Sequence, residues 1–274
     1  MELQQSPLYA KYIRALGWKI IRIGSVRMFY KHILLAGGLL KIQRPRHLPP
    51  VGQLVPILTE YRIRTVAIEP HPKENLTTYK RWCTGIAKYC KVVRSSYQPT
   101  KTILIDITAP EDKIFSRFTD SKRRAVRKAI KNCITVEESG DIRNLIKIKN
   151  KSSGAFGFIT TFGIDRFWPI MAPKYATVVL AYTDTHKRVG GILLVFWEKT
   201  AYYWIAGATK HGKKVFAPTL LVWEALKVAK RRGAKQFDFV GVWDERKANH
   251  HHDWLGFTRF KEGFGGVPFY YPLY

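Results

Sequence analysis

The chain is poor in acidic residues, and this shortage is its first informative feature. Its 274 residues include 20 Asp and Glu against 47 Lys and Arg, which gives a formal net charge of +27. A solvated surface needs a net charge of only about 2–8 in a small domain. The excess therefore predicts a polyanionic partner: nucleic acid, an anionic membrane face, or both. A basic surface that is merely solvated is the alternative.

Cysteine and long apolar runs are also scarce. The three cysteines, Cys83, Cys90 and Cys133, lack metal-ligand spacing and lie in apolar or basic contexts, so we expect buried, reduced thiols. The opening MELQQSPLYAKY has no apolar signal core. The longest apolar run, Ile33 to Leu40, is far shorter than the roughly 20 residues that span a bilayer. We expect a cytoplasmic protein, soluble or peripheral at the inner face of the cell membrane.

Cofactor and metal motifs are missing from the sequence. It contains no P-loop, no dinucleotide fingerprint, and no serine or cysteine in a recognisable nucleophile motif. The histidines of HHHDW (250–254) are adjacent, so their side chains point in different directions, and we expect surface histidines there. We therefore expect neither a cofactor nor a metal.

Strand and helix patterns alternate along the whole chain, which predicts an α/β (α+β) fold. We expect two subdomains, residues 1–100 and 101–267, with residues 268–274 forming a strand that returns to the first. SSYQPT (95–100) is the best linker candidate. The expected elements are a helix at 7–18, strands near 19–30 and 33–43, a helix at 51–61, a strand ending at Glu69, a helix at 76–86 and a strand at 102–107.

The last third of the chain reads as a strand, a helix and a second strand. AYYWIAGAT alternates as a strand does, Pro218 suits a helix start, Gly233 suits its end, and AKQFDFVGV follows as a strand. Such a right-handed crossover places ligands where the first strand meets the helix. This junction holds a basic loop, so the expected ligand is anionic. The basic residues of the loop are Lys210, His211, Lys213 and Lys214.

Single residues along this block also form a recognisable series. They are Tyr203, Gly207, Pro218, Trp223, Ala229, Asp238, Gly241, Phe260, Lys261, Phe264 and Gly265. In order and spacing the series resembles the C-terminal half of the Fem family (FemA, FemB and FemX-like proteins). QSPLYAKYIRALGW and TILIDITAPEDKIFSRFTDSKRRAVRKAIKN are also similar to family segments, so the resemblance runs from about Gln5 to Tyr274.

The resemblance implies a GNAT-type acyltransferase fold with two similar subdomains, each a mixed central sheet flanked by helices. It implies an aminoacyltransferase of cell-wall synthesis, which moves an amino acid from aminoacyl-tRNA to an amine of a peptidoglycan precursor peptide to form the interpeptide bridge. The partners would be aminoacyl-tRNA and a lipid-linked or UDP-linked muramyl peptide, with contact to an anionic membrane as a further option.

Site residues follow from the resemblance position by position. Lys261, preceded by Phe260, falls where the family has a lysine that stabilises negative charge on the attacked carbonyl; a surface lysine is the alternative. Arg14 matches a basic residue that meets precursor phosphates, and Glu69 an acidic residue that faces the substrate; plain surface charges are the alternatives. Tyr203 matches an aromatic position beside the site, or it is a tyrosine that packs the sheet.

Two positions depart from the family pattern. Phe162 stands where the family has an arginine, and Ile205 stands where it has a second tyrosine. The first half is shorter than in better-known members, and the second half lacks a long helical hairpin that some members have. We therefore expect contacts to the acceptor that differ in detail.

The segment Lys113–Asn132 predicts one amphipathic helix. Its apolar face holds Ile114, Phe118, Ala125 and Ala129. We expect its basic face to bind tRNA phosphates together with the basic loop, although a solvated face is the alternative. The expected tRNA-binding residues are Arg123, Arg124, Arg127, Lys131, Lys210, Lys213 and Lys214.

Two other functions fit the same fold. An acyl-CoA-dependent N-acyltransferase needs a glycine-rich turn that holds pyrophosphate, but KHGKKVFAP has one glycine and a bulky Val215-Phe216 pair at that place. The other is a non-catalytic RNA- or membrane-binding protein that keeps the fold and the charge.

Overall fold

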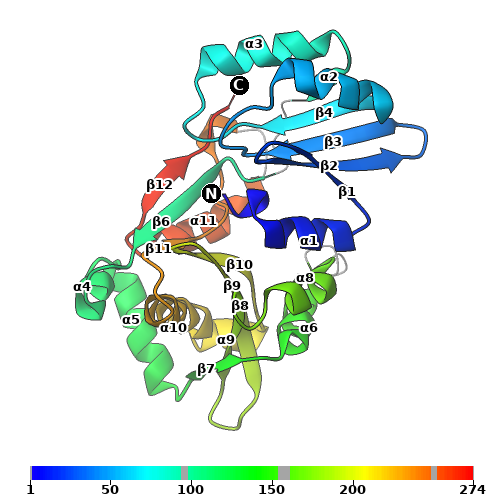
Figure 1. Ribbon diagram of the computed structural model, residues 1–274. Helices are drawn as coiled ribbons and strands as arrows, with labels where there is room; N and C mark the ends of the chain where they lie inside the picture. Colours follow the sequence, from blue (N-terminus) through cyan, green and yellow to red (C-terminus); the bar gives the residue numbers. More distant parts are fainter. Residues whose placement is uncertain (1, 94–97, 154–160, 248–251, 274) are drawn as a thin grey trace. The chain divides into compact units, whose positions relative to one another are not determined.

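A computed structural model describes residues 2–93, 98–153, 161–247 and 252–273. The chain forms two compact units (Figure 1). The first contains residues Met1–Thr100 and Tyr270–Tyr274, and the second contains Lys101–Phe269. A strand that returns to the first subdomain was expected at 268–274, but the last strand, Val267–Tyr270, pairs within the sheet of the second unit.

The first unit is built on a five-stranded sheet in the order β1-β2-β3-β4-β5. The pairs β1–β2 and β2–β3 are antiparallel, whereas β3–β4 and β4–β5 are parallel. Ser6 caps α1 by accepting from the N–H of Tyr9, and Asn75 caps α3 in the same way at Thr78. The elements are η1 (Leu3–Gln5), α1 (Pro7–Ala15), β1 (Lys19–Ile23), β2 (Val26–Ile33), β3 (Gly37–Gln43), α2 (Val51–Glu60), β4 (Ile63–Glu69), α3 (Leu76–Ala87) and β5 (Lys91–Val93).

The two strands expected at 19–30 and 33–43 are three strands in the structure, and that prediction was wrong. A turn at Gly24, with φ +56°, separates β1 from β2, and a second turn after Ile33 separates β2 from β3. The apolar run that begins at Ile33 extends across the second turn, so hydrophobicity alone gave no sign of it. Of the linker candidate at 95–100, residues 95–97 lie outside the described residues.

The second unit is built on a seven-stranded sheet in the order β12-β6-β11-β10-β9-β8-β7. The pair β10–β11 is parallel and is joined by α10, which is the predicted crossover. The elements are β6 (Lys101–Asp106), α4 (Glu111–Ser116), α5 (Asp120–Lys131), β7 (Thr135–Ser139), α6 (Ile142–Ser152), α8 (Ile164–Met171), β8 (Ala176–Tyr182), β9 (Arg188–Trp197), β10 (Thr200–Ala208), α9 (Lys210–Lys214), α10 (Ala217–Arg231), β11 (Gln236–Asp238), η3 (Glu245–Lys247), η4 (His252–Trp254), α11 (Leu255–Glu262) and β12 (Val267–Tyr270).

Helices α10 and α6 pack on opposite faces of this sheet. A side chain on Gly190 would meet Leu221 of α10, whereas one on the next residue, Gly191, would meet Leu145 of α6. Successive residues of a strand face opposite sides, so the two contacts identify the two faces. Both faces of β8 and β9 are buried, which explains why these strands are almost continuously apolar.

The helix expected from Lys113 to Asn132 is two helices, so that prediction was wrong. The chain leaves α4 after Ser116 and enters α5 at Asp120, and the buried Phe118 lies between them against Trp223 and Phe264. The N–H of Thr119 donates to the carbonyl of Gly263, a contact distant in sequence that periodicity cannot reveal. The basic loop after β10 also contains a short helix, α9, capped by Thr209.

The thiols are less buried than expected. Cys83 is buried, but Cys90 is half-buried and Cys133 is exposed, with φ +54° just after α5. All three are free thiols. Among the described helices, none is long and apolar enough to cross a membrane.

Candidate functional site

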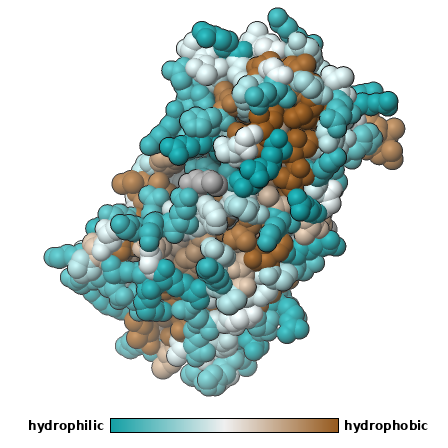
Figure 2. Space-filling view, in the orientation of Figure 1, coloured by the Kyte–Doolittle hydropathy of each residue, from teal (hydrophilic) through white to brown (hydrophobic). Residues whose placement is uncertain are grey.

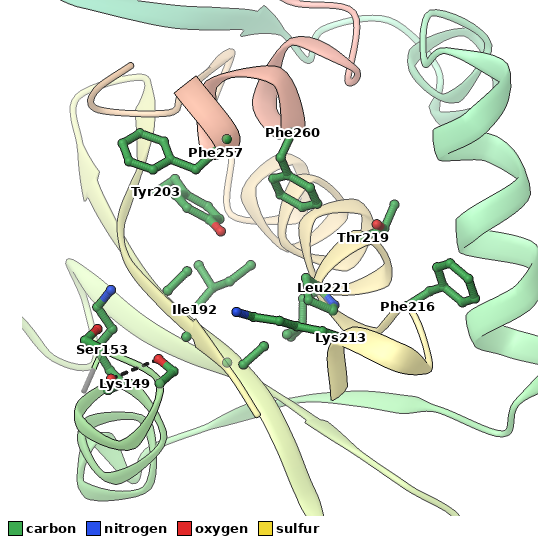
Figure 3. Close-up of a pocket in the computed structure, with 17 residues that line it drawn as sticks. Lys149, Ser153, Ile192, Tyr203, Lys213, Phe216, Thr219, Leu221, Phe257 and Phe260 are labelled. Atoms are coloured by element: carbon green, nitrogen blue, oxygen red, sulfur yellow. Dashed lines mark hydrogen bonds between the residues drawn. The ribbon is translucent and has the colours of Figure 1, made fainter. Parts of the chain in front are cut away.

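A cavity of about 530 Å³ lies in the second unit, between the end of β10 and the start of α10 (Figure 3). It is therefore at the strand-to-helix junction where the crossover rule predicts a ligand. Its described lining is Lys149, Ser152 and Ser153 of α6 and the turn after it; Gly191 and Ile192 of β9; Tyr203, Ala206, Gly207 and Ala208 of β10; Lys213 of α9; Phe216; Pro218, Thr219 and Leu221 of α10; and Gly256, Phe257 and Phe260 of α11.

The cavity opens because β10 and β11 pair over only part of their length. β11 pairs with β10 from Thr200 to Tyr202, whereas β9 continues beside β10 as far as Ala208. A bulge places Trp204 as an extra residue between Tyr203 and Ile205, so the predicted simple alternation of this strand was wrong. The second half of β10 is thus left without β11 beside it, and its residues form one wall of the cavity.

Close backbone packing brings α6 to this wall. A Cβ added to Gly207 would stand 2.9 Å from Cα of Lys149, so only glycine lets the helix approach the strand this closely. Gly212 plays the same part for α9, because an added Cβ would overlap the carbonyl of Val189. These two contacts bring Lys149 and Lys213 to the same cavity.

The cavity is cationic. Lys149 is half-buried, and its pKa is lowered first by burial and then by the nearby charge of Lys213. Figure 3 shows the side chain of Lys213 extending into the space between β10 and α10. None of the described lining residues is acidic. Two lysines in a partly apolar cavity without a carboxylate favour an anionic ligand.

Aromatic side chains form another part of the lining. Tyr203 packs against Phe239 with the ring centroids 5.4 Å apart, and desolvation raises the pKa of its hydroxyl. Phe257 and Phe260 come from α11. Lys122 of α5 lies over the ring of Phe260, with Nζ 4.0 Å from the centroid. Tyr203 therefore both packs the sheet and lines the cavity, so the two interpretations of this residue are compatible.

Lys261 lies directly behind this aromatic wall. Its side chain is buried, and its Nζ donates to the carbonyls of Phe239, at 2.9 Å, and Gly241, at 2.6 Å. The same Nζ is 4.8 Å from the ring centroid of Phe257 and 5.5 Å from that of Tyr203. Burial lowers its pKa to about 7, Asp238 opposes this shift, and Lys149 adds to it. The alternative of a surface lysine is therefore wrong.

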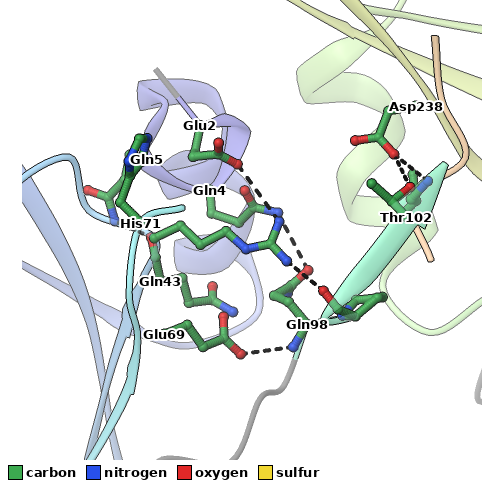
Figure 4. A network of polar contacts seen from close by, with 12 residues as sticks. Glu2, Gln4, Gln5, Gln43, Glu69, His71, Gln98, Thr102 and Asp238 are labelled. Carbon is green, nitrogen blue, oxygen red and sulfur yellow. Dashed lines mark hydrogen bonds and ion pairs between the residues drawn. The ribbon is translucent and has the colours of Figure 1, made fainter. Parts of the chain in front are cut away.

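Glu69 and Arg14 belong to the first unit, in different surroundings. Glu69 is 6% exposed, and its Oε1 accepts from the backbone N–H of Gln98 at 2.8 Å (Figure 4). The interpretation of Glu69 as a plain surface charge is therefore wrong, because Glu69 is buried. Its hydrogen bond fixes the chain after β5 within the first unit. Arg14 lies exposed in the last turn of α1, where a cation is favoured by the helix dipole.

The expected tRNA-binding residues fall into three groups. Arg124, Arg127 and Lys131 are exposed on α5. Arg123 instead folds back on the carbonyls of Ser116 and Phe118 and pairs with Asp120, so it holds the α4–α5 junction. Lys210, Lys213 and Lys214 are all exposed on α9, and Lys213 also lines the cavity. On α5, buried Val126 joins Ala129 on the packed face.

The chain is similar to known proteins in both sequence and structure. Residues 176–271 match the model of the FemAB family, a stretch that runs from β8 into the last residues of the chain. The crystal structure of FemX superposes with a TM-score of 0.76 at 16% identity, over 98% of this chain and 90% of that one. Residues 176–271 are therefore similar in sequence to the FemAB family, and the chain shares the fold of FemX over almost its whole length. The resemblance and the α/β GNAT-like fold expected from the sequence are thereby confirmed.

Other solved structures share the fold of this chain at lower similarity. The C-terminal domain of a putative lysylphosphatidylglycerol synthetase from Agrobacterium fabrum gives a TM-score of 0.64 at 13% identity, over 98% of this chain and 87% of that one. A tandem GNAT protein from the clavulanic acid biosynthesis pathway gives 0.53 at 9% identity, over 91% and 78%. A search of curated proteins by sequence finds no match.

The departures from the Fem pattern have clear positions in the structure. Phe162 is 74% exposed, and Ile205 follows the bulge in β10.

The described residues contain no group of His, Cys, Asp or Glu that could hold a metal ion. Of the HHHDW segment, His250 and His251 lie outside the described residues. Lys149 was not predicted from the sequence, although Gly207 is a signal for the closely packed helix that carries it.

Proposed function

We propose that this protein is a Fem-type enzyme, which transfers an amino acid from aminoacyl-tRNA to an amine of a peptidoglycan precursor peptide. The family match and the FemX-like fold support the general class, a Fem-type peptidoglycan aminoacyltransferase. The observation that carries the specific reaction is the cavity, which combines Lys149 and Lys213 with an aromatic wall that covers the buried Lys261.

The reaction requires the enzyme only to position the two substrates and to stabilise the charge that develops. The acceptor amine attacks the ester carbonyl of the aminoacyl-tRNA, a C–N bond forms, and the C–O bond to the terminal ribose breaks. The proton of the amine passes to the leaving ribose oxygen. Because the ester is already activated, orientation and stabilisation of the oxyanion supply the rate.

Lys261 is suited to stabilise that oxyanion when it is protonated. A lysine ammonium has three N–H donors, and the carbonyls of Phe239 and Gly241 take two of them. In this proposal the third donor serves the attacked carbonyl, which enters beside Tyr203 and Phe257. A buried cation acts more strongly on developing charge than an exposed one, because the surroundings screen it less. Phe260 would shape the entrance for the ester.

Lys149 and Lys213 are suited to the anionic end of the donor substrate. The terminal phosphates of a tRNA acceptor strand are the anions closest to the reacting ester. Two lysines at the cavity could hold them as point charges, while the exposed cations of α5 and α9 contact phosphates farther along the tRNA. Arg14 and Glu69 remain proposed acceptor-binding residues of the first unit.

An acyl-CoA donor fits the start of α10 poorly. Pyrophosphate sites at helix N-termini depend on free backbone N–H groups. Here Pro218 has no N–H, and the N–H of Thr219 already donates to the carbonyl of Phe216. Phe216 itself occupies the left-handed position that precedes the helix, with φ +62°. These features favour aminoacyl-tRNA over CoA as donor.

A phospholipid headgroup is the second candidate acceptor. The observation in its favour is the fold shared with the C-terminal domain of a putative lysylphosphatidylglycerol synthetase. In that case a hydroxyl of the lipid headgroup would attack the same ester and the product would be an ester rather than an amide.

The decisive assay offers both acceptors with one charged tRNA pool. Muramyl peptides, UDP-linked and lipid-linked, and phosphatidylglycerol vesicles are incubated with the protein, and acceptor masses are measured with and without prior RNase treatment. An RNase-sensitive, alkali-stable mass gain on the peptide supports the proposal, and an alkali-labile gain on the lipid supports the second candidate. A gain with acetyl-CoA in place of tRNA identifies an N-acyltransferase, and no gain with any donor identifies a non-catalytic binding protein.

A further inference from the structure

The hairpin between β2 and β3 carries an apolar tip that is exposed in the part of the chain that the structure describes. Ile33 pairs with Gly37, so Leu34, Leu35 and Ala36 form the turn. Leu34 is 84% exposed and Leu35 is 95% exposed, and Ile33 is also exposed. Figure 1 shows this hairpin projecting beyond the rest of its sheet, and Figure 2 shows hydrophobic surface at the same edge.

These leucines contribute almost no buried surface to the fold. Leu35 has φ +69°, a left-handed conformation that glycine or asparagine adopts more readily than leucine does. A turn selected only for stability and solubility would carry polar residues and glycine at such positions. An exposed apolar tip held in an unfavourable conformation is therefore a feature to be explained by binding.

Positive charge surrounds the tip. Lys31 is exposed two residues before Ile33, and the side chain of Arg64 lies where a side chain on Gly37 would stand. Gly38 pairs with Ile63, so Arg62 also lies at this end of the sheet. We call Lys31, Arg62 and Arg64 the basic flank. The segment Leu3–Thr59, which contains the whole hairpin, has nine Lys and Arg and no Asp or Glu.

We propose that the hairpin tip, residues 33–36, inserts into the interface of an anionic lipid bilayer while the basic flank contacts lipid phosphates. Apolar side chains enter the boundary between headgroups and acyl chains, and each nearby Lys or Arg adds attraction to an anionic surface. This site is separate from the catalytic proposal, and its test has no catalytic readout.

The shape and charge of the tip favour a bilayer over a protein partner. A stable protein interface buries about 800 Å² on each side, whereas this tip offers three apolar side chains on a narrow turn. A second copy of the chain would bring two basic flanks together, which like charges oppose. A bilayer surface accepts a narrow convex tip and supplies the opposite charge.

The first test removes the apolar tip without straining the turn. The variant Leu34→Ser/Leu35→Asn keeps every charge, and asparagine tolerates the left-handed conformation. The matched control is Phe162→Ser/Val267→Ser, because Phe162 and Val267 are also exposed, at 74% and 65%, but lie in the second unit and outside α5. We expect the tip variant to lose at least about tenfold in affinity for vesicles of phosphatidylcholine with phosphatidylglycerol. The control should bind as the wild type does.

The second test reports insertion directly. An environment-sensitive NBD label is attached to the thiol introduced by Leu34→Cys in a Cys133→Ser background, and a second sample carries the label on the native, exposed Cys133. We expect a blue shift and quenching by brominated lipid at the tip, and neither at position 133. Equal vesicle affinity of tip variant and control, or a tip label that stays in water on bound vesicles, would overturn the proposal. So would a dimer in sedimentation that disappears in the tip variant, since the tip would then bind a second copy.

Discussion

Lys261 and the exposed face of α5 place positive charge in opposite surroundings. Lys261 is buried, is fixed by two backbone carbonyls and has a pKa lowered to about 7. Arg124 and Arg127 stand in solvent on α5. The net charge of +27 therefore combines two kinds of cation, buried ones and solvent-exposed ones. A buried cation can act on a reacting group, whereas exposed cations act collectively on a distant polyanion.

The largest expected effect comes from removing the buried cation. Lys261→Met should lower the single-turnover rate of amide formation by about 10²–10³, the loss typical of one oxyanion donor. Lys230→Met is the matched control, because Lys230 also donates to backbone carbonyls, those of Ile107, Thr108 and Ala109, away from the cavity. The control should lower thermal stability and leave the rate unchanged. Unchanged rates in both variants would remove Lys261 from the mechanism.

The same lysine makes stability depend on pH. Lys261 has a pKa of about 7 in the folded chain and an ordinary value of 10.5. Between these values the unfolded chain holds a proton that the folded chain lacks, so unfolding takes up a proton and stability rises with pH. The free energy of unfolding should rise across this window by up to about 1.4 kcal/mol per pH unit. Denaturation of Lys261→Met should lack this rise, and equal slopes would contradict the assigned burial.

The cavity lysines should affect donor affinity more than rate. Lys149→Met and Lys213→Met should each weaken aminoacyl-tRNA binding by about tenfold, because each removes one charge-assisted contact. Lys147→Met on the exposed side of α6 is the control and should bind normally. Filter binding with a non-hydrolysable aminoacyl-tRNA separates the cases, and an equal loss in all three variants would mean that only general charge matters.

Charge reversal on α5 should change binding through its salt dependence. Arg124→Glu/Arg127→Glu should weaken tRNA binding several-fold and flatten the salt slope by somewhat under one unit for each lost phosphate contact. Arg123 is omitted because its bonds hold the α4–α5 junction. The control, Lys187→Glu/Arg188→Glu, has the same charge change in the β8–β9 turn. If the variant still binds tRNA but no longer binds anionic vesicles, α5 binds the membrane and not tRNA.

The smallest expected effect concerns the first unit. Arg14→Ala should weaken binding of the phosphorylated acceptor by less than about tenfold and leave tRNA affinity unchanged. Lys11→Ala on the same helix is the control and should change neither. Isothermal calorimetry with a UDP-linked muramyl peptide measures the effect. An equal loss of acceptor and tRNA affinity would assign Arg14 to folding or to general charge.

Local signals explain which parts of the fold were predictable. The unit β10–α10–β11 followed from Pro218, from an apolar face that is buried in the structure, and from Gly233, which has φ +78°. All three signals act within a few residues of their position. The break between α4 and α5 depends instead on a bond from Thr119 to Gly263, which sequence periodicity does not register.

Only those residues of the candidate site that belong to the family resemblance or to the strand–helix–strand crossover could be predicted from the sequence. Tyr203 and Phe260 line the cavity and Lys261 lies behind it, as expected of residues beside one site, but their roles stay predictions. Lys149 was missed because its place depends on how α6 packs against Gly207. The basic loop was interpreted as one set of tRNA contacts, whereas in the structure both Lys210 and Lys213 are exposed on α9 and only Lys213 of the two lines the cavity.

The proposed division between a catalytic buried lysine and tRNA-binding exposed arginines is best tested by measuring rate and affinity together in two variants. Lys261→Met and Arg124→Glu/Arg127→Glu are compared with the wild type in single-turnover assays over a range of tRNA concentrations. Lys261→Met should bind tRNA normally, but its single-turnover rate at saturating tRNA should fall by about 10²–10³. The α5 variant should bind weakly yet reach the wild-type rate at saturation. Full saturating rate in Lys261→Met, or loss of both quantities in both variants, would contradict this division.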